Sequence, residues 1–277
     1  MLLVPGDFFA MGVSPEVLAD ECSIFGRTCD EALLAPAGPQ HPAYVDSFYI
    51  DAYEVTNAAY VTFLNDTGEP QAACQNVPCL LLDSSRIGQV DGRYVVESGF
   101  SRHPVTGITW YGAALFCAWR GARLPTEAEW EMAASWDPDT SSKFLYPWGN
   151  DFEGNAANSC DVNCTQAQSI GIYDDGYAET APVASYPRGR SPAGAYDMAG
   201  NVWEWVSDWF GRDYYAQAPQ ENPQGPTSGA GRVLRGGSWF DTGNFTATVF
   251  RSGLPPDQSN DAIGFRCALE TGPHSSE

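Results

Sequence analysis

The chain has 277 residues, which is enough for one large domain or two small ones, and its 35 acidic and 14 basic side chains give a formal charge of −21. This balance argues against nucleic acid and anionic membranes as partners, and it suits divalent cations, basic ligands or simple solubility. The aromatic content of 13% argues against disorder, and no apolar run is long enough to cross a membrane.

The N-terminal half alternates short regular elements with irregular segments. A strand bent at Pro5-Gly6 is expected over Leu2–Met11, and alternation predicts a second strand over Tyr44–Val55. Thr56 and Thr109 are in position to cap helices. The remaining elements are a helix that ends near Asn65, a helix over Trp110–Arg120, and loop insertions over 13–41 and 68–100, the second with a hairpin near Arg93–Glu97.

A third helix is expected to begin near the middle of the chain, because Thr126 and Glu129 have the spacing of a capping box. The segment Pro138–Gly194 is rich in Gly, Asn, Asp and Pro, and so long an irregular segment needs a staple such as a disulfide or a metal. The remaining elements are strands over Ala247–Arg251 and Ile263–Leu269 and a polar tail over 271–277. With no internal repeat and no linker, the sequence predicts one domain over residues 1–277.

Six of the eight cysteines form close pairs in turn-rich segments, and two stand alone. The pairs are Cys22 with Cys29, Cys74 with Cys79 and Cys160 with Cys164, and the isolated residues are Cys117 and Cys267. Close pairs in such segments indicate local disulfides, which form in an oxidising compartment. A structural zinc site is the alternative, but the chain has no Cys-x2-Cys motif and only three histidines.

The N-terminus shows no signal peptide, because Pro5-Gly6-Asp7 interrupts the short apolar start. Either a leader is missing from this chain, or the protein is cytosolic with free thiols. We favour the first interpretation and expect an extracytoplasmic protein, which means a periplasmic, secreted or cell-surface location.

Two blocks frame the most informative stretch of the chain. They are Asp197-Met198-Ala199-Gly200-Asn201-Val202-Trp203-Glu204-Trp205 and Arg232-Val233-Leu234-Arg235-Gly236-Gly237-Ser238-Trp239. In the first block two tryptophans flank Glu204, behind a Gly-Asn pair that favours a tight turn. One interpretation is a core glutamate with satisfied hydrogen bonds, and the other is an oxygen-rich cation site held rigid by aromatic packing.

Further motifs accompany these blocks along the chain. They are Val4-Pro5-Gly6-Asp7-Phe8, Asp51-Ala52-Tyr53-Glu54-Val55-Thr56-Asn57, His103-Pro104-Val105, Arg123-Leu124-Pro125-Thr126-Glu127-Ala128-Glu129-Trp130-Glu131, Tyr146-Pro147-Trp148-Gly149 and Gly264-Phe265-Arg266-Cys267. In this order the series resembles the formylglycine-generating enzyme, or sulfatase-modifying factor, family over essentially the whole chain. The resemblance implies a single α+β domain of the formylglycine-generating enzyme fold, related to C-type lectins and low in regular secondary structure.

The resemblance also implies structural Ca2+ and one long-range disulfide. One calcium site would use the side chains of Asp197 and Glu204 with the carbonyls of Gly200 and Val202, and the other the side chains of Asn158 and Asp175 with the carbonyls of Ser159 and Tyr177. Such mixed oxygen shells suit a hard cation, and the second site would staple the long irregular segment. The alternative for the second set is that its side chains only form turns. The family's disulfide would join Cys117 to Cys267.

The chain departs from the family's enzymes after Ser238. Those enzymes carry a Cys-x4-Cys pair there, whose thiolates bind copper(I) and activate oxygen to oxidise a substrate cysteine to formylglycine. In this chain Asp241 and Thr246 stand at the two positions, and neither can bind copper(I) as a thiolate or exchange with a thiol. We therefore expect no copper and no formylglycine-generating oxidase activity.

Other branches of the family are non-haem iron enzymes that need a histidine and carboxylate set. The three histidines, His41, His103 and His274, lie in two early segments and the tail, which does not favour such a site. Asp241 with Thr246 could support acid–base chemistry, although a lone aspartate in a polar loop is more often hydrogen-bonded or solvated.

The loop after Ser238 combines aromatic and small polar side chains, which is typical of adaptable binding surfaces. The candidate ligand-binding residues are Trp239, Phe240, Asp241, Asn244, Phe245 and Thr246, with simple packing of the loop on itself as the alternative. We expect a non-catalytic binding or assembly module for an unknown protein, peptide or glycan ligand. The alternatives are a divergent metal- or carboxylate-dependent enzyme that uses Asp241 and a structural subunit of a larger assembly.

Overall fold

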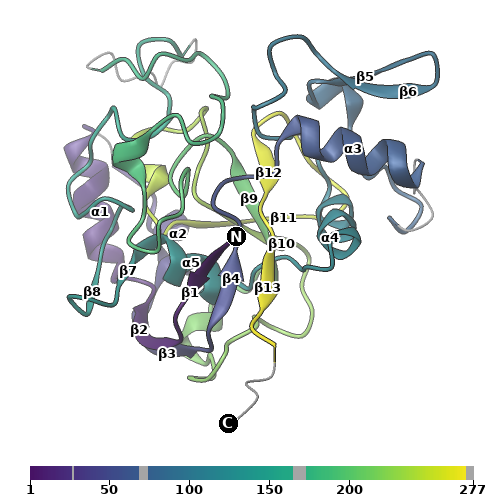
Figure 1. Ribbon diagram of the computed structural model, residues 1–277. Helices are drawn as coiled ribbons and strands as arrows, with labels where there is room; N and C mark the ends of the chain where they lie inside the picture. The colour runs from purple at the N-terminus through teal and green to yellow at the C-terminus, as the bar shows by residue number, and fades with distance from the viewer. Residues whose placement is uncertain (27, 69–73, 165–172, 273–277) are drawn as a thin grey trace.

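Helices and strands alternate along the chain and are mostly short (Figure 1). The computed structural model describes residues 1–26, 28–68, 74–164 and 173–272. Between residues 144 and 202, the described part of the chain contains one regular element, the 3-10 helix η3 (Pro187–Gly189). These features confirm the predicted α+β fold with little regular secondary structure.

Two small sheets form the centre of the fold, and their strands come from distant parts of the chain (Figure 1). The larger sheet has the order β11-β10-β9-β12, in which β12 runs parallel to β9 and the other pairs are antiparallel. The smaller sheet, β1-β4-β13, is antiparallel throughout. The strands are β9 (Trp203–Trp209), β10 (Arg232–Arg235), β11 (Arg251–Leu254) and β12 (Ile263–Phe265), and then β1 (Leu2–Val4), β4 (Phe48–Ile50) and β13 (Ala268–Glu270). Only Arg266 and Cys267 separate β12 from β13, so they tie the two sheets together.

Three helices begin where the sequence predicts a capping threonine. Thr56, Thr109 and Thr126 each accept a hydrogen bond from the backbone amide three residues further on, and Glu129 completes a capping box with Thr126. The helices are α3 (Asn57–Thr67), α4 (Trp110–Trp119) and α5 (Glu127–Ser135). All three predicted starts are confirmed, and the predicted ends of α3 and α4 agree within two residues.

Every residue of α5 is buried, so its acidic side chains need partners inside the protein. Glu127 forms an ion pair with Arg251, and Glu131 forms ion pairs with Arg235 and Lys143. Arg235 and Arg251 lie on neighbouring strands, β10 and β11. The helix is therefore fixed to the larger sheet by buried charge as well as by apolar contacts.

The segment 13–41, predicted as a loop insertion, is largely helical, so that prediction is wrong. It contains α1 (Pro15–Ile24), α2 (Glu31–Leu34) and the 3-10 helix η1 (Ala35–Ala37), and it leads into β3 (His41–Val45), which pairs with β2 (Asp7–Met11). Only Leu18, Glu21 and Cys22 of α1 are buried. With so few buried positions, the sequence has no clear helical period.

The segment 68–100 contains the predicted hairpin. Its strands are β5 (Ile87–Val90) and β6 (Arg93–Val96), and the turn between them is Asp91-Gly92, where both residues have the positive φ that favours a tight hairpin. Residues 69–73 of this segment, and residues 273–277 of the predicted polar tail, lie outside the described residues.

Strand boundaries differ more from the predictions than helix boundaries do. The strand expected over Tyr44–Val55 is interrupted after β3 and continues as β4, and the strand expected over Ile263–Leu269 is divided between β12 and β13. The strand expected over Ala247–Arg251 begins only at Arg251, because the 3-10 helix η5 (Gly243–Thr246) precedes it. The sequence analysis does not predict β9 and β10 as strands, and it also misses the short pair β7 (Trp136–Asp137) and β8 (Ser142–Lys143).

All eight cysteines form disulfides, and the three local pairs are those the sequence predicts. The four bonds are Cys22–Cys29, Cys74–Cys79, Cys117–Cys267 and Cys160–Cys164. They leave no thiolate for the alternative zinc site, and they indicate folding in an oxidising environment. In the described part of the chain, no helix has the length and hydropathy that a membrane crossing requires.

Candidate functional site

A tight turn in the first central block sets the positions of its side chains. Asp197, Gly200 and Asn201 have φ angles of 57°, 75° and 62°. A Cβ on Gly200 would lie 2.1 Å from the carbonyl oxygen of Asn158, so only glycine fits there. The backbone amide of Asn201 donates to the same carbonyl oxygen over 2.8 Å. The turn therefore brings the two predicted calcium sets into contact.

Glu204, the carboxylate between the two tryptophans, is fully buried and fully paired. Its Oε1 accepts from Arg266 Nη2 over 2.6 Å, and its Oε2 accepts from Arg266 Nε over 2.7 Å and from Trp130 Nε1 over 2.9 Å. A two-point ion pair of this kind is among the stronger charged contacts in proteins. The side chain of Glu204 is thus satisfied by the protein itself.

Two more carboxyl groups lie near this ion pair. Burial raises the pKa of Asp197 to about 6. Burial also raises the pKa of Glu54 well above its usual range, and the charges of Asp197 and Glu204 add to that rise. Glu54 Oε2 accepts from Asn201 Nδ2 over 2.7 Å, whereas its Oε1 is buried with no hydrogen-bond partner among the described residues. Three carboxyl groups therefore share the single guanidinium of Arg266.

The second predicted set lies in the middle of the long irregular segment, at residues 158–159 and 175–177. Asp175 accepts from the backbone amides of Ser159 and Tyr177, over 2.9 Å and 3.0 Å. Burial raises the pKa of Asp175 to about 7. Asn158 is buried, and its Oδ1 has no hydrogen-bond partner among the described residues. A partly buried carboxyl group and an unpartnered amide oxygen are donors that suit a hard cation.

Among the described residues, no three side chains of His, Cys, Asp or Glu are grouped so that they could hold a metal ion. Each predicted set contains at most two acidic side chains, and its other donors would be an amide and backbone carbonyls. Of those carbonyl donors, Ser159, Gly200 and Val202 belong to buried residues. The donor chemistry of the second set fits calcium better than that of the first, where Glu204 already has a cationic partner.

Asp241 and Thr246, which replace the two cysteines, are built into the protein interior. Asp241 Oδ2 accepts from Ser238 Oγ over 2.6 Å and from Trp203 Nε1 over 2.8 Å, and its carbonyl oxygen accepts from the backbone amide of Cys160. Thr246 is fully buried and donates from Oγ1 to the carbonyl oxygen of Gly243 over 2.8 Å. Both side chains therefore stabilise the loop that carries them.

The helix α1 and its disulfide pack against η5, which is the centre of the predicted ligand loop. Asn244 Nδ2 lies 3.5 Å from Cys22 Sγ and 3.7 Å from Cys29 Sγ. A Cβ on Gly243 would meet the rings of Phe152 and Phe25. The segment 13–41 thus covers the position where the family's enzymes carry reactive cysteines.

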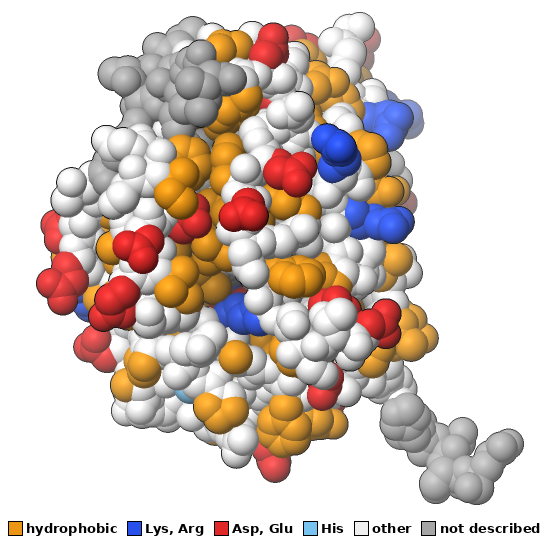
Figure 2. Space-filling model, turned by 90° about the vertical axis from the view of Figure 1, so that its left-hand side faces the viewer, with side chains coloured by type: hydrophobic (Ala, Val, Ile, Leu, Met, Phe, Trp, Pro, Cys, Tyr) orange, Lys and Arg blue, Asp and Glu red, His pale blue; other side chains and the backbone are white. Residues whose placement is uncertain are grey.

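The accessible part of the predicted ligand loop is aromatic. Phe240 is 37% exposed and meets Trp239 edge to face with ring centroids 5.6 Å apart, whereas Asn244 and Thr246 are buried. Phe245 is partly buried and packs on Phe250. The face on the α1 side of the molecule shows hydrophobic patches among scattered acidic side chains and few basic ones (Figure 2). The six candidate residues stay a prediction, of which Trp239 and Phe240 are open to a ligand.

The sequence analysis missed three polar residues that organise this region: Glu54, Asn201 and Arg266. Asn201 connects Asn158 of the second set to Glu54, because its Oδ1 accepts from Asn158 Nδ2 over 3.0 Å while its Nδ2 donates to Glu54. A signal for Arg266 was present in the sequence. It lies between Phe265 and Cys267 in an apolar stretch, and a buried arginine requires a buried acidic partner.

Comparison with known proteins gives the context for this geometry. The model of the sulfatase-modifying factor enzyme 1-like domain matches residues 1–271. The formylglycine-generating enzyme of Streptomyces coelicolor is 32% identical over 293 aligned residues, which cover 96% of this chain and 87% of that protein. The inactive C-alpha-formylglycine-generating enzyme 2 of Bos taurus is 37% identical over 61% of this chain and 51% of that protein.

A third relative is much longer than the chain. The serine/threonine-protein kinase pkn1 of Chlamydia pneumoniae is 42% identical over 83% of this chain, and the match spans 34% of the kinase, so the chain corresponds to about a third of that protein. Among solved structures, PvdO from Pseudomonas aeruginosa superimposes with a TM-score of 0.68 at 26% identity, covering 97% of this chain and 93% of PvdO. The fold and the motif series together show that the chain belongs to the sulfatase-modifying factor family.

Proposed function

We propose that this domain is a non-catalytic binding or assembly module that works in an extracytoplasmic compartment. Its frame would be held by four disulfides and by calcium. Its ligand, a protein, peptide or glycan, would contact the half-buried Trp239 and the exposed Phe240. Exposed aromatic residues on a rigid frame supply much contact area with little loss of conformational entropy.

One observation carries this proposal: the side chains of Asp241 and Thr246 both form hydrogen bonds within the protein. Neither position offers a thiolate, and α1 with its disulfide packs over the loop between them. The existence of a relative named as an inactive formylglycine-generating enzyme supports the same interpretation. An alternative enzyme based on Asp241 has less support, because Oδ2 already accepts two hydrogen bonds.

Calcium belongs to the proposal at the second predicted set. Asn158 Oδ1 and the carboxyl group of Asp175 would supply the side-chain oxygens, and the carbonyl oxygens of Ser159 and Tyr177 would complete the shell. The bound ion would tie residues 158–159 to residues 175–177 within the long irregular segment and would neutralise a partly buried carboxylate. At the first set, Arg266 already neutralises Glu204.

The proposal is tested first by its chemistry. Purified protein is incubated with copper(I), oxygen and a Cys-x-Pro-x-Arg peptide, and the peptide is analysed by mass spectrometry. We expect no formylglycine, while a catalytically competent relative converts the same peptide in parallel. Formylglycine produced by this chain in amounts that scale with its concentration refutes the non-catalytic assignment.

The binding part is tested on the loop itself. Glycan arrays and a displayed peptide library are screened with the wild-type protein and with a variant that carries Trp239→Ala and Phe240→Ala. We expect ligands that bind the wild type and lose affinity for the variant, with unchanged melting temperature. Phe8→Ala, another exposed aromatic residue, is the matched control. Equal binding by the loop variant and the control rejects this surface.

A further inference from the structure

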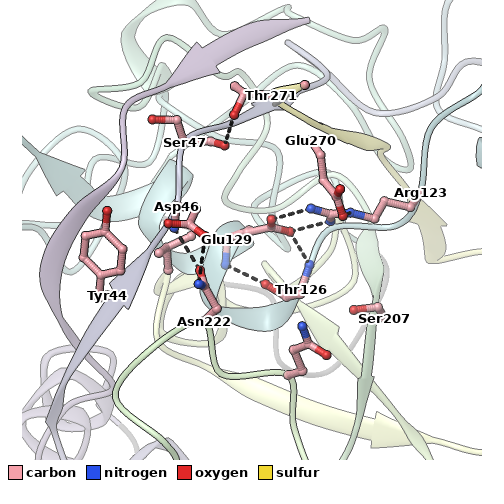
Figure 3. A pocket seen from close by; sticks show the side chains of 13 residues that line it. Tyr44, Asp46, Ser47, Arg123, Thr126, Glu129, Ser207, Asn222, Glu270 and Thr271 are labelled. Carbon is pink, nitrogen blue, oxygen red and sulfur yellow. Dashed lines mark hydrogen bonds and ion pairs between the residues drawn. The ribbon is translucent and has the colours of Figure 1, made fainter. Parts of the chain in front are cut away.

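A large open cavity, seen from close by in Figure 3, is lined by no residue of the predicted calcium sets. Its volume is about 840 Å³, which is in the range of sites that hold small ligands or peptide side chains. The connection between β3 and β4, the start of α5, the residues 222–224 and the end of β13 form its walls. None of the residues that line it belongs to 239–246.

The walls of the cavity are held in place by hydrogen bonds. On one side, the backbone amide of Asp46 donates to Asn222 Oδ1, and Asn222 Nδ2 donates to Asp46 Oδ2, both over 2.9 Å. On the other side, Arg123 Nη1 and Nη2 donate to the two oxygens of Glu129, over 2.7 Å and 2.6 Å. Figure 3 shows both pairs among the side chains that line the cavity. The cavity is therefore formed before any ligand arrives.

The charge in the cavity favours a cationic ligand. Arg123 is the single basic residue among those that line it, and its guanidinium is already occupied by Glu129, by the carbonyl oxygen of Leu124 and by Glu270 at 3.4 Å. Asp46 and Glu270 are exposed and supply further carboxylate oxygens at the opening. The chain's charge of −21 adds long-range attraction for a basic ligand.

A second cavity adjoins the first, and the pair sets the shape of the ligand. Asn222 and Gln224 line both, and the second cavity has a volume of about 510 Å³. Its other walls include Tyr214, Pro219 and Pro226, so it is more apolar than the first. A ligand that fills both must be elongated, with a positive group at one end and an apolar group at the other.

We propose that the two joined cavities bind an extended segment of polypeptide, with a lysine or arginine side chain between Asp46 and Glu270 and an adjacent apolar side chain against Tyr214. Two carboxylates and a backbone of fixed shape recognise the basic side chain, and the shared wall at Gln224 sets its spacing from the apolar one. This site is independent of the proposed function of the aromatic loop.

The binding experiment uses a hexapeptide of alternating lysine and leucine, blocked at both ends. Calorimetry with the whole chain at low ionic strength measures its affinity, and a glutamate–leucine hexapeptide and spermidine are titrated for comparison. We expect binding of the lysine–leucine peptide, no binding of the acidic peptide, and weaker binding of spermidine because it lacks an apolar group. Equal affinity for the acidic peptide overturns the proposal, and spermidine binding as tightly as the basic peptide overturns its peptide part.

Variants then locate the site. Asp46→Asn and Glu270→Gln should each lower the affinity for the basic peptide about two- to fivefold, as expected for exposed charge pairs. The effect should be smaller at high salt concentration. Glu153→Gln, which removes an exposed carboxylate outside both cavities, is the matched control. Gln224→Trp should narrow the passage between the two cavities, and it should therefore lower the affinity for the peptide but not the affinity for spermidine. If the Asp46→Asn, Glu270→Gln double variant binds like the Glu153→Gln control while its melting temperature is normal, the proposal is refuted.

Discussion

Removing calcium with EGTA should lower the melting temperature of the wild-type protein, and Asp175→Asn should abolish this response. The reason lies in two polar groups within the long irregular segment, one buried and one partly buried. Asn158 Oδ1 has no partner among the described residues, and the carboxyl group of Asp175 has a pKa raised by burial to about 7. A bound divalent cation would satisfy the first group and keep the second ionised.

The expected size follows from two estimates. A buried polar atom without a partner destabilises a protein by about 1–3 kcal/mol. Calcium present at about 100 times its dissociation constant stabilises the folded state by about 2.7 kcal/mol, because it binds only that state. For a domain of this size the second figure corresponds to about 5–10 °C in melting temperature. The shift should grow with the logarithm of the calcium concentration.

The assay is calorimetry of the wild type and two variants, each in excess EGTA and in excess calcium. Asp175→Asn keeps the shape and one acceptor oxygen but should lose the calcium response. Glu204→Gln should lower stability in both conditions yet keep the response, because both oxygens of Glu204 already contact Arg266. The assignment is refuted if the melting temperature of the wild type is the same in EGTA and in calcium, or if calcium raises the melting temperature of Asp175→Asn as much as that of the wild type.

Three further predictions concern buried charge and covalent bonding. Burial raises the pKa of Asp208 to about 7. Between about pH 4 and 7 the folded state therefore holds a proton that the unfolded chain has released, and the free energy of unfolding falls as pH rises through this range, by at most about 4 kcal/mol. In urea unfolding across this pH range, the free energy of unfolding of the Asp208→Asn variant should depend less on pH than that of the wild type. If the two proteins lose stability in parallel as pH rises, the assignment to Asp208 is wrong. Arg266→Met should destabilise the protein by about 3–5 kcal/mol in urea unfolding, because it leaves Glu204 buried and unpaired, and adding Glu204→Gln should restore part of the loss. Replacing Cys117 and Cys267 by alanine should lower the free energy of unfolding by about 5 kcal/mol, since their disulfide spans 150 residues. An unfolding midpoint equal to that of the wild type would contradict the presence of this disulfide.

The sequence predicted best where local chemistry decides the structure. The three capping threonines, Thr56, Thr109 and Thr126, mark the helix starts because each side chain satisfies a backbone amide within its own turn. The close cysteine pairs were predictable for the same reason. The bond Cys117–Cys267 came from the family resemblance, because nothing local connects residues so far apart.

The sequence predicted least where distant segments decide the structure. In β9 a buried face is covered partly by Arg266 and Trp130, so the strand does not alternate simply between apolar and polar residues. The helix α1 buries few residues and gave no periodic signal. Its place against η5 depends on contacts with Asn244, more than 200 residues further along the chain.

The position of α1 also changes where a function of this domain can be located. In the family's enzymes the loop after Ser238 needs reactive thiols that a substrate can reach. Here Asn244 and Thr246 are buried, and the Cys22–Cys29 disulfide lies against Asn244. A reactive site at that depth would require α1 to move, and its disulfide and its contacts with η5 oppose such movement. The two surfaces that we propose for a partner are accordingly peripheral: the aromatic pair Trp239 and Phe240, and the acidic opening between Asp46 and Glu270.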